Sequence, residues 1–330
     1  MENTMINKKR IEWVDIAKGI GIFLMVMGHT GIPRIGNQWI YSFHMPLFFF
    51  ISGFLFQPEK YSPCEFIGRK MKTLVVPYIF FIFLNWIGCE ILQYEKYPPH
   101  SIIHILLYGS NGAVWFIYVL FFTELYFFML EKIRSMNNII ISLIIFVSTI
   151  IAGYFMFLYK VHLPYKMEVI GMALFFYGIG YWIKSQKIFY KKLNVFLIFV
   201  LFMLSVILSY YQTPRLDMAD NNYGMGGGTI CVALLGIYLT IQVAMLLEHY
   251  LSMRLKNAII YIGKNTIVVV GMSQLVSMSL KKYFELYQVP SFLSSLVRHF
   301  LLWCFLVGLI YLFTKYIPFL IGKSSVYYKK

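Results

Sequence analysis

Three ionisable side chains fall within the first long apolar segment of this sequence: Asp15, Lys18 and His29. On an α-helix, the spacing between Lys18 and His29 corresponds to about three turns plus 20°, or roughly 16 Å along the axis. The two residues therefore share one helix face without touching, and they could contact the two ends of one long ligand. Asp15 precedes Lys18 by one turn and can neutralise its charge on the same face.

A second histidine, His44, lies in the next apolar segment at a depth close to that of His29. Pro46 follows it, and a proline removes a helical hydrogen bond and permits a local break. Two imidazoles at similar depth on consecutive helices could line one pocket, and imidazole exchanges protons near neutral pH. For His29 alone, an interfacial histidine bonded to a carbonyl is the alternative interpretation.

The composition indicates what kind of chain must position these side chains. Hydrophobic residues make up 59% and charged residues 13% of the 330 residues, whereas an average soluble chain is roughly 25% charged. A soluble globule would lack polar surface, and intrinsic disorder is excluded because so much apolar surface must be buried. We therefore predict an all-α, polytopic integral membrane protein in which residues 1–330 form a single transmembrane domain.

Ten segments have the length of about 20 mostly apolar residues that a membrane span requires. They are 14–32, 38–56, 73–92, 112–130, 138–158, 166–184, 193–211, 229–247, 258–280 and 292–314. Alternate connections hold 19 and 7 Lys or Arg residues. Because basic residues are enriched on the cytoplasmic side, we predict that both termini are cytoplasmic. The same asymmetry explains most of the net charge of +15 without a nucleic-acid partner.

Four further residues have charges or ligand atoms that need a role. Glu124 and Lys264 lie at compatible depths in the fourth and ninth predicted spans, which leaves open a structural ion pair or a functional role. His100 and His104 could share a metal ion on one helix face, but no third ligand is within reach. We therefore predict that the protein holds no metal.

Two consecutive motifs near the start of the sequence resemble those of a known protein family. The run WVDIAKGIGIFLMVMGHT at 13–30, followed by IYSFHMPLFFFISGFLF at 40–56, resembles the acyltransferase-3 family of membrane acyltransferases, and within it the fucose 4-O-acetylase-like branch. Weaker similarities are GRKMKTLVVPY at 68–78, GAVWFIY at 112–118, DNNYG at 220–224 and IGKNTIVVV at 262–270. The resemblance extends over the whole chain in length and span number.

The resemblance implies roles for residues at both ends of the first span. The family pairs a basic residue with a histidine after ten intervening residues, which here are Lys18 and His29. His29 would then be the catalytic histidine and Lys18 a contact to the donor. A basic pair before the third span is matched by Arg69 and Lys72, where Lys replaces the more usual Arg and weakens bidentate phosphate binding.

On the acceptor side the sequence departs from many relatives. These carry a further histidine in the ninth span, where this chain has Met272, Ser273 and Gln274, so Gln274 is the candidate replacement. Trp115 matches a family motif, although an interfacial aromatic belt explains it equally well. We also expect Asp220 and Asn222, in the longest outer loop, to shape the entrance for the acceptor.

The resemblance thus implies a membrane-embedded O-acyltransferase of the bacterial cytoplasmic membrane. It would move an acyl group, expected to be acetyl, from cytoplasmic acetyl-CoA to a hydroxyl of a surface polysaccharide or another glycan. A sugar hydroxyl needs a base to accept its proton, so we predict His29 as general base, with Asp15 and His44 in support. The expected partners are acyl-CoA, a carbohydrate acceptor and membrane lipid, and a homodimer is compatible with the sequence.

A polysaccharide or small-molecule transporter or flippase of the same fold is the alternative function. Ten spans and intramembrane charges fit a transporter, as do glycines and prolines that could break helices: Pro46, Pro77, Gly171, Gly178 and Gly180. The two halves show no internal repeat, which weakens this interpretation. A purely structural subunit would not need the costly polar residues of the first two spans.

Overall fold

The computed structural model describes residues 11–92, 105, 109, 112–136, 138–212, 214–224, 226–287 and 291–323. Within these residues the fold is helical, and the only extended pairing is an isolated bridge between Asp217 and Asn222. The helices are α1 (Glu12–Gly28), α2 (Arg34–Leu55), α3 (Pro63–Lys70), α4 (Val76–Leu92), α6 (Trp115–Ser135), α7 (Ile139–Leu158), α8 (Ile170–Ile183), α9 (Val195–Tyr210), α10 (Gly227–Tyr250), α11 (Met253–Gly263), α12 (Thr266–Leu286) and α13 (Ser291–Tyr316). His100 and His104 lie outside the described residues.

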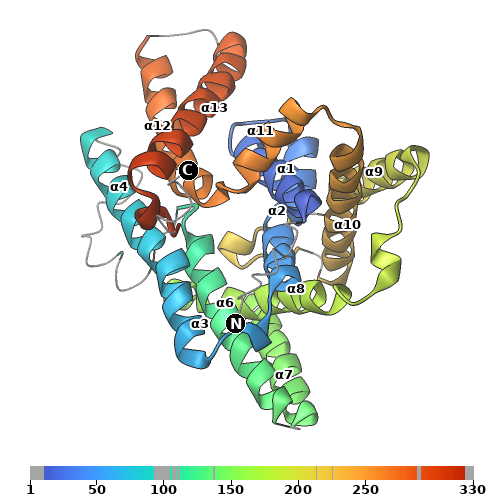
Figure 1. The fold of residues 1–330 in the computed structure, drawn as a ribbon. Helices are drawn as coiled ribbons and strands as arrows, with labels where there is room; N and C mark the ends of the chain where they lie inside the picture. Colours follow the sequence, from blue (N-terminus) through green and yellow to red (C-terminus); the bar gives the residue numbers. More distant parts are fainter. Residues whose placement is uncertain are drawn as a thin grey trace, which may run out of the picture.

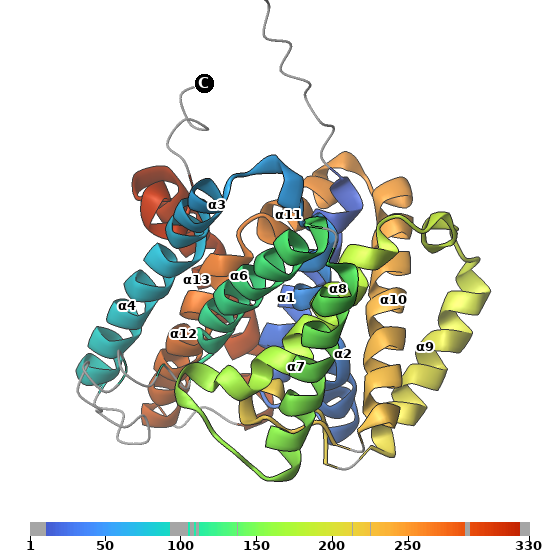
Figure 2. The same ribbon diagram turned by 90° about the horizontal axis from the view of Figure 1, so that it is seen from below.

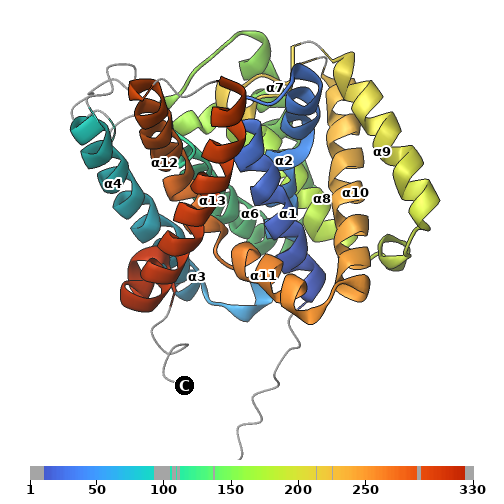
Figure 3. The same cartoon turned by 90° about the horizontal axis from the view of Figure 1, so that it is seen from above.

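The helices form a bundle whose centre is the α1–α2 pair (Figure 1). In a side view, α4 lies at one edge of the bundle and α9 at the other (Figure 3). Helix α1 is buried along most of its length, and α2 packs against α1, α8, α9 and α10. Most polar residues of the first two predicted spans are therefore held inside the protein.

The outer helices have the burial pattern of membrane helices. On α7 and α9 the buried positions are mostly small or polar, namely Ser142, Gly153, Ile198, Ser205 and Ser209. Their large apolar side chains point outward and are exposed. Apolar surfaces facing outward and small residues at helix contacts are what lipid as a solvent favours. The protein is therefore an all-α, polytopic membrane protein.

Among the described residues, four helical segments are long and apolar enough to cross a membrane: Pro63–Leu92, Ile139–Leu158, Gly227–Tyr250 and Val297–Tyr316. A fifth crossing results if the bent pair α11–α12 counts as one span. The ten-span topology, including cytoplasmic termini, remains a prediction. The start of α1 and the 3₁₀ turn Pro318–Ile321 lie at the same end of the bundle, as an even number of crossings requires (Figures 2 and 3).

The structure decides two questions about helix breaks that the sequence left open. The span predicted at 258–280 is not straight, because α11 and α12 meet at an angle of 76°. Asn265 is buried at this corner, and its side-chain amide donates to the Tyr261 carbonyl at the end of α11. Conversely, α2 continues through Pro46 without interruption.

The carboxylate of Glu124 also has a partner other than the one considered from sequence. Its Oε2 atom lies 2.6 Å from the Lys70 ammonium nitrogen, whereas Lys264 is exposed at the corner before α12. Because Glu124 is 5% exposed, the ion pair supplies the counter-charge that a buried carboxylate needs. It ties the end of α3 to the middle of α6.

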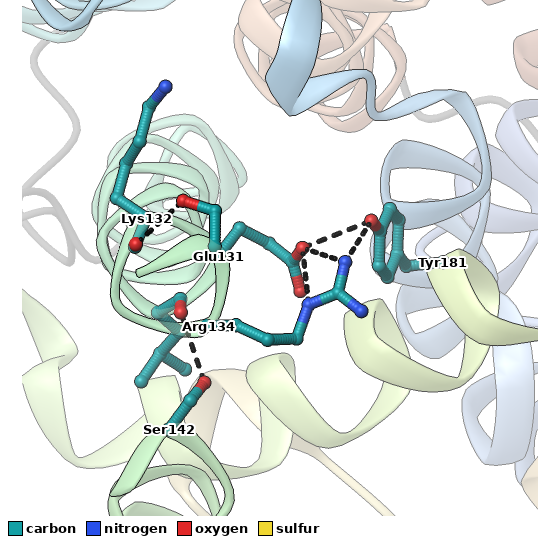
Figure 4. Close-up of polar contacts among 7 residues, drawn as sticks. Glu131, Lys132, Arg134, Ser142 and Tyr181 are labelled. Carbon is teal, nitrogen blue, oxygen red and sulfur yellow. Dashed lines mark hydrogen bonds and ion pairs between the residues drawn. The ribbon is translucent and has the colours of Figure 1, made fainter. Parts of the chain in front are cut away.

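A second carboxylate ties α6 to α8 (Figure 4). Glu131 accepts hydrogen bonds from Arg134 Nε and Nη2 at 3.0 and 2.6 Å, and from the Tyr181 hydroxyl at 3.1 Å. Nearby, the Ser142 hydroxyl donates to the Leu130 carbonyl and so fixes the start of α7. These contacts hold the end of α6 in place.

Glycine permits a very close helix crossing between α2 and α8. A Cβ atom added to Gly53 would lie 1.9 Å from the Tyr177 carbonyl oxygen, and one added to Gly180 would lie 2.0 Å from that of Phe50. The crossing partners are backbone atoms, which cannot move aside cheaply. Gly180 therefore serves helix packing, and it does not break α8.

We expect Gly180→Ala to destabilise the protein by about 1–3 kcal/mol or more, because it forces two backbones apart. The measurement is the thermal unfolding midpoint of the purified protein in detergent. Gly68→Ala in α3 is the matched control, since no atom lies within 4 Å of its added Cβ. Equal midpoints for the two variants would contradict the role of this crossing.

Candidate active site

A cavity of about 330 Å³ lies at the end of the bundle where α1 finishes. Its walls come from α1, α2, the start of α6, the turn at 216–220 and α12, with one residue from α13. Five of the residues singled out from sequence line it: His29, His44, Trp115, Asp220 and Gln274. The fold thus brings together residues that are far apart in the chain.

His29 caps the C-terminal end of α1, and its side chain is exposed to the cavity. Its Nδ1 atom lies 3.1 Å from the hydroxyl oxygen of Tyr41, which lies on the neighbouring helix α2. This contact leaves Nε2 as the ring nitrogen that can face a ligand. Tyr41 was not among the residues singled out from sequence, and one tyrosine among 26 carries no distinguishing pattern.

His44 is buried on α2, and its hydrogen bond defines its tautomer. Nδ1 lies 2.9 Å from the Ile40 carbonyl oxygen, which can only accept, so Nδ1 must carry a proton. In the neutral ring Nε2 is then a hydrogen-bond acceptor. The Tyr41 ring lies edge-on to both imidazoles, with centroid distances of 5.7 Å to His29 and 4.9 Å to His44. The two histidines therefore form one cluster around Tyr41.

The turn at 215–222 covers one side of the cavity. Burial raises the pKa of Asp217, and the neighbouring Asp220 carboxylate adds to this effect, while Arg215 opposes it. The carboxylate of Asp217 accepts from Arg215 Nη2 at 3.1 Å and from the Ala219 amide at 3.2 Å. Asp220 lines the cavity.

Asn222 has a structural position in this turn and does not line the cavity. Its backbone pairs with that of Asp217, and its side-chain oxygen accepts a hydrogen bond from the Gly224 amide at 3.0 Å. It shapes the turn that carries Asp220.

The opposite wall belongs to α12 and the start of α6. Ser273, Ser277 and Lys281 recur every fourth residue on α12 and line the cavity with Gln274. Gln274 Oε1 accepts a hydrogen bond from the Ala113 amide at 2.9 Å, just before the buried Trp115. Gln274 therefore fixes the turn that leads into α6.

The residues predicted on the donor side lie away from the cavity. Lys18 is paired with Asp15 at 3.0 Å, and Asp15 is 14 residues from His29, or roughly 21 Å along α1. Asp15 therefore does not contact His29. Arg69 donates to the Tyr61 hydroxyl, and Lys72 is exposed in a π-helical turn, Met71–Val75, between α3 and α4. A π-turn of this kind often marks a functional site.

No group of three His, Cys, Asp or Glu side chains suited to a metal occurs among the residues that the structure describes. The side chains that line the cavity include two imidazoles, one phenol, the carboxylates of Asp217 and Asp220, several hydroxyls and the Lys281 ammonium group.

Comparison with known proteins assigns the class. Residues 11–315 match the family Acyl_transf_3, described as an acyltransferase domain, and the chain belongs to this family. It is 31% identical over 146 residues to nodulation protein NolL of Mesorhizobium japonicum, covering 39% of this chain and 38% of that protein. It is 29% identical over 157 residues to nodulation protein NolL of Sinorhizobium fredii, covering 42% and 40%. The chain thus spans about two fifths of the curated relatives it matches. No solved structure matches it.

We expect Gln274→Leu to loosen the turn before α6, because the part-buried Ala113 amide loses its acceptor at a cost of about 1–3 kcal/mol. Hydrogen exchange measured by mass spectrometry should then rise in peptides covering residues 112–118. Ser277→Ala changes the same wall but keeps the Gln274–Ala113 bond, so its exchange should match that of the wild type. Unchanged exchange in Gln274→Leu would disprove this role.

Proposed function

We propose that the protein is a membrane O-acyltransferase that transfers an acetyl group from cytoplasmic acetyl-CoA to a glycan hydroxyl. The observation that carries the proposal is the His29–Tyr41–His44 cluster in a cavity, in a chain of the acyltransferase family. A transfer reaction needs a base beside the acceptor hydroxyl, and His29 has a ring nitrogen available for that task.

The chemistry follows acyl-transfer logic. When Nδ1–H of His29 donates to the Tyr41 oxygen, Nε2 is unprotonated and accepts the proton of the acceptor hydroxyl. The hydroxyl oxygen attacks the thioester carbonyl, a new C–O bond forms and the C–S bond breaks. The leaving CoA thiolate recovers the proton from the imidazolium. Nε2 of His44, which is also an acceptor, would take a hydrogen bond from a neighbouring hydroxyl of the sugar and so orient it.

The donor would approach from the end of the bundle that carries Lys18, Arg69 and Lys72. Cationic side chains there suit the phosphates of CoA. The pantetheine arm would follow α1 for roughly 16 Å, so that the thioester reaches His29. Asp15 supports this end by neutralising part of the charge of Lys18 and does not act on the base itself.

The acceptor would occupy the cavity from the outer side of the membrane. A cavity of about 330 Å³ is at the small end of ligand sites, which span about 300–1,000 Å³. It suits one sugar unit together with the acyl group. Asp220 and the hydroxyls of α12 provide hydrogen bonds, and Trp115 provides an apolar wall, which together fit a carbohydrate.

The proposed location of the protein is the cell membrane, where lipid would contact the exposed apolar faces of α7 and α9. A transporter or flippase of the same fold remains the second candidate, but the glycine at 180 packs against a backbone and Pro46 does not interrupt its helix. Neither of these two residues therefore breaks the helix in which it lies.

We expect His29→Ala to lower the rate of acyl transfer by about 10²–10⁴-fold, the usual contribution of a general base. The assay follows release of free CoA from acetyl-CoA with a glycan acceptor, using purified protein in detergent without a gradient. His249→Ala, an exposed histidine at the end of α10, is the control and should retain activity. Undiminished transfer by a folded His29→Ala variant would refute the assignment.

The two basic residues Arg69 and Lys72 should affect the binding of the donor. Replacing both with Gln should raise the KM for acetyl-CoA by about tenfold while kcat stays close to wild type, because charge-assisted bonds to phosphate are lost. Lys132→Gln, a basic residue at the end of α6, should leave KM unchanged. A fall in kcat with unchanged KM would place the pair outside the donor site.

A further inference from the structure

Arg215 occupies a central position at the rim of the cavity that its sequence context does not indicate. Its guanidinium carbon lies 3.6 Å from the centroid of the Tyr41 ring. Its Nη1 donates to Asn37 Oδ1, and its Nη2 donates to Asp217 at 3.1 Å. One side chain thus joins the outer turn to two residues of α2.

Both α2 residues that Arg215 contacts hold His29. The Tyr41 hydroxyl lies 3.1 Å from His29 Nδ1. The Asn37 side-chain amide donates to the Gly28 carbonyl at 2.9 Å, immediately before His29 in the chain. The imidazole is therefore fixed through its ring by Tyr41 and through its backbone by Asn37, and Arg215 connects these two supports.

We propose that Arg215 is a positioning residue for His29, acting through Tyr41 and Asn37. This inference rests on the proposed function of His29 as general base. A guanidinium is planar with a fixed fork of donors, so it can stack on one ring and bond an amide and a carboxylate at once. Two of its five N–H groups donate to Asn37 and Asp217, and these bonds with the stacking on Tyr41 are the contacts by which it holds the base.

His29 needs such support because the rate of the transfer step depends on the exact position of the base. A displacement of a catalytic group by about 1 Å costs on the order of 10²-fold in rate. His29 is the C-cap residue of α1: its backbone N–H still bonds to the Val26 carbonyl, but no helical turn follows it. The contacts from Asn37, Tyr41 and Arg215 supply the restraint that the helix no longer gives.

The test compares Arg215→Gln, Tyr41→Phe and the double variant in the CoA-release assay. We expect each single variant to lower kcat about 10- to 100-fold with little change in either KM. Because both act on the same support, the double variant should be no slower than the slower single variant. Arg34→Gln, an exposed arginine at the start of α2, is the control and should match wild type.

A second measurement does not depend on activity. Hydrogen exchange at residues 29–37 should rise in Arg215→Gln and stay unchanged in Arg34→Gln. Additive losses in the double variant, a change confined to the acceptor KM, or unchanged exchange would overturn the role of Arg215. An inactive wild-type protein would instead overturn the proposed function, whatever the exchange experiment shows.

Discussion

The hydrogen bonds of the α1–α2 pair are the constraint on which the rest of the structure depends. Polar side chains on membrane helices have no water to satisfy them, so the protein must supply each partner. Asp15 with Lys18, Tyr41 with His29, and the Ile40 carbonyl with His44 are these partners. Surrounding α1 and α2 with other helices keeps lipid away from these groups.

Because α1 is a rigid helix, it keeps the Lys18 ammonium group and the His29 imidazole far apart. Its first half carries a cation neutralised by a neighbouring carboxylate, and its end delivers an imidazole to a cavity. A helix cannot bring these two groups together, because each residue adds about 1.5 Å of length. The arrangement suits a long ligand that is held by charge at one end and reacts at the other.

The close crossing of α2 and α8 serves the same purpose from the opposite side. Glycines at 53 and 180 let the two backbones touch, and this contact fixes the helix that carries Tyr41 and His44. The ion pair of Glu124 with Lys70 and the hydrogen bond from the Tyr181 hydroxyl to Glu131 then fasten α6, whose first residue is Trp115. Buried pairs of this kind define which helices are neighbours more than they add stability.

The sequence by itself determined the class of the protein and the relative placement of Lys18 and His29 on its first helix. Low charge and long apolar runs fixed a helical membrane protein, and helical periodicity placed Lys18 and His29 on one face, because both properties depend only on local spacing. Asp220, Trp115 and Gln274 were candidates for the acceptor side from the sequence, and the structure gathers all three at one cavity. Only the tertiary structure decided the corner at Asn265, the pairing of Glu124 with Lys70, and the contacts of Arg215 with Tyr41 and Asn37. These last contacts join residues more than 170 positions apart, and no periodic pattern in a single chain records which distant loop will fold over which helix.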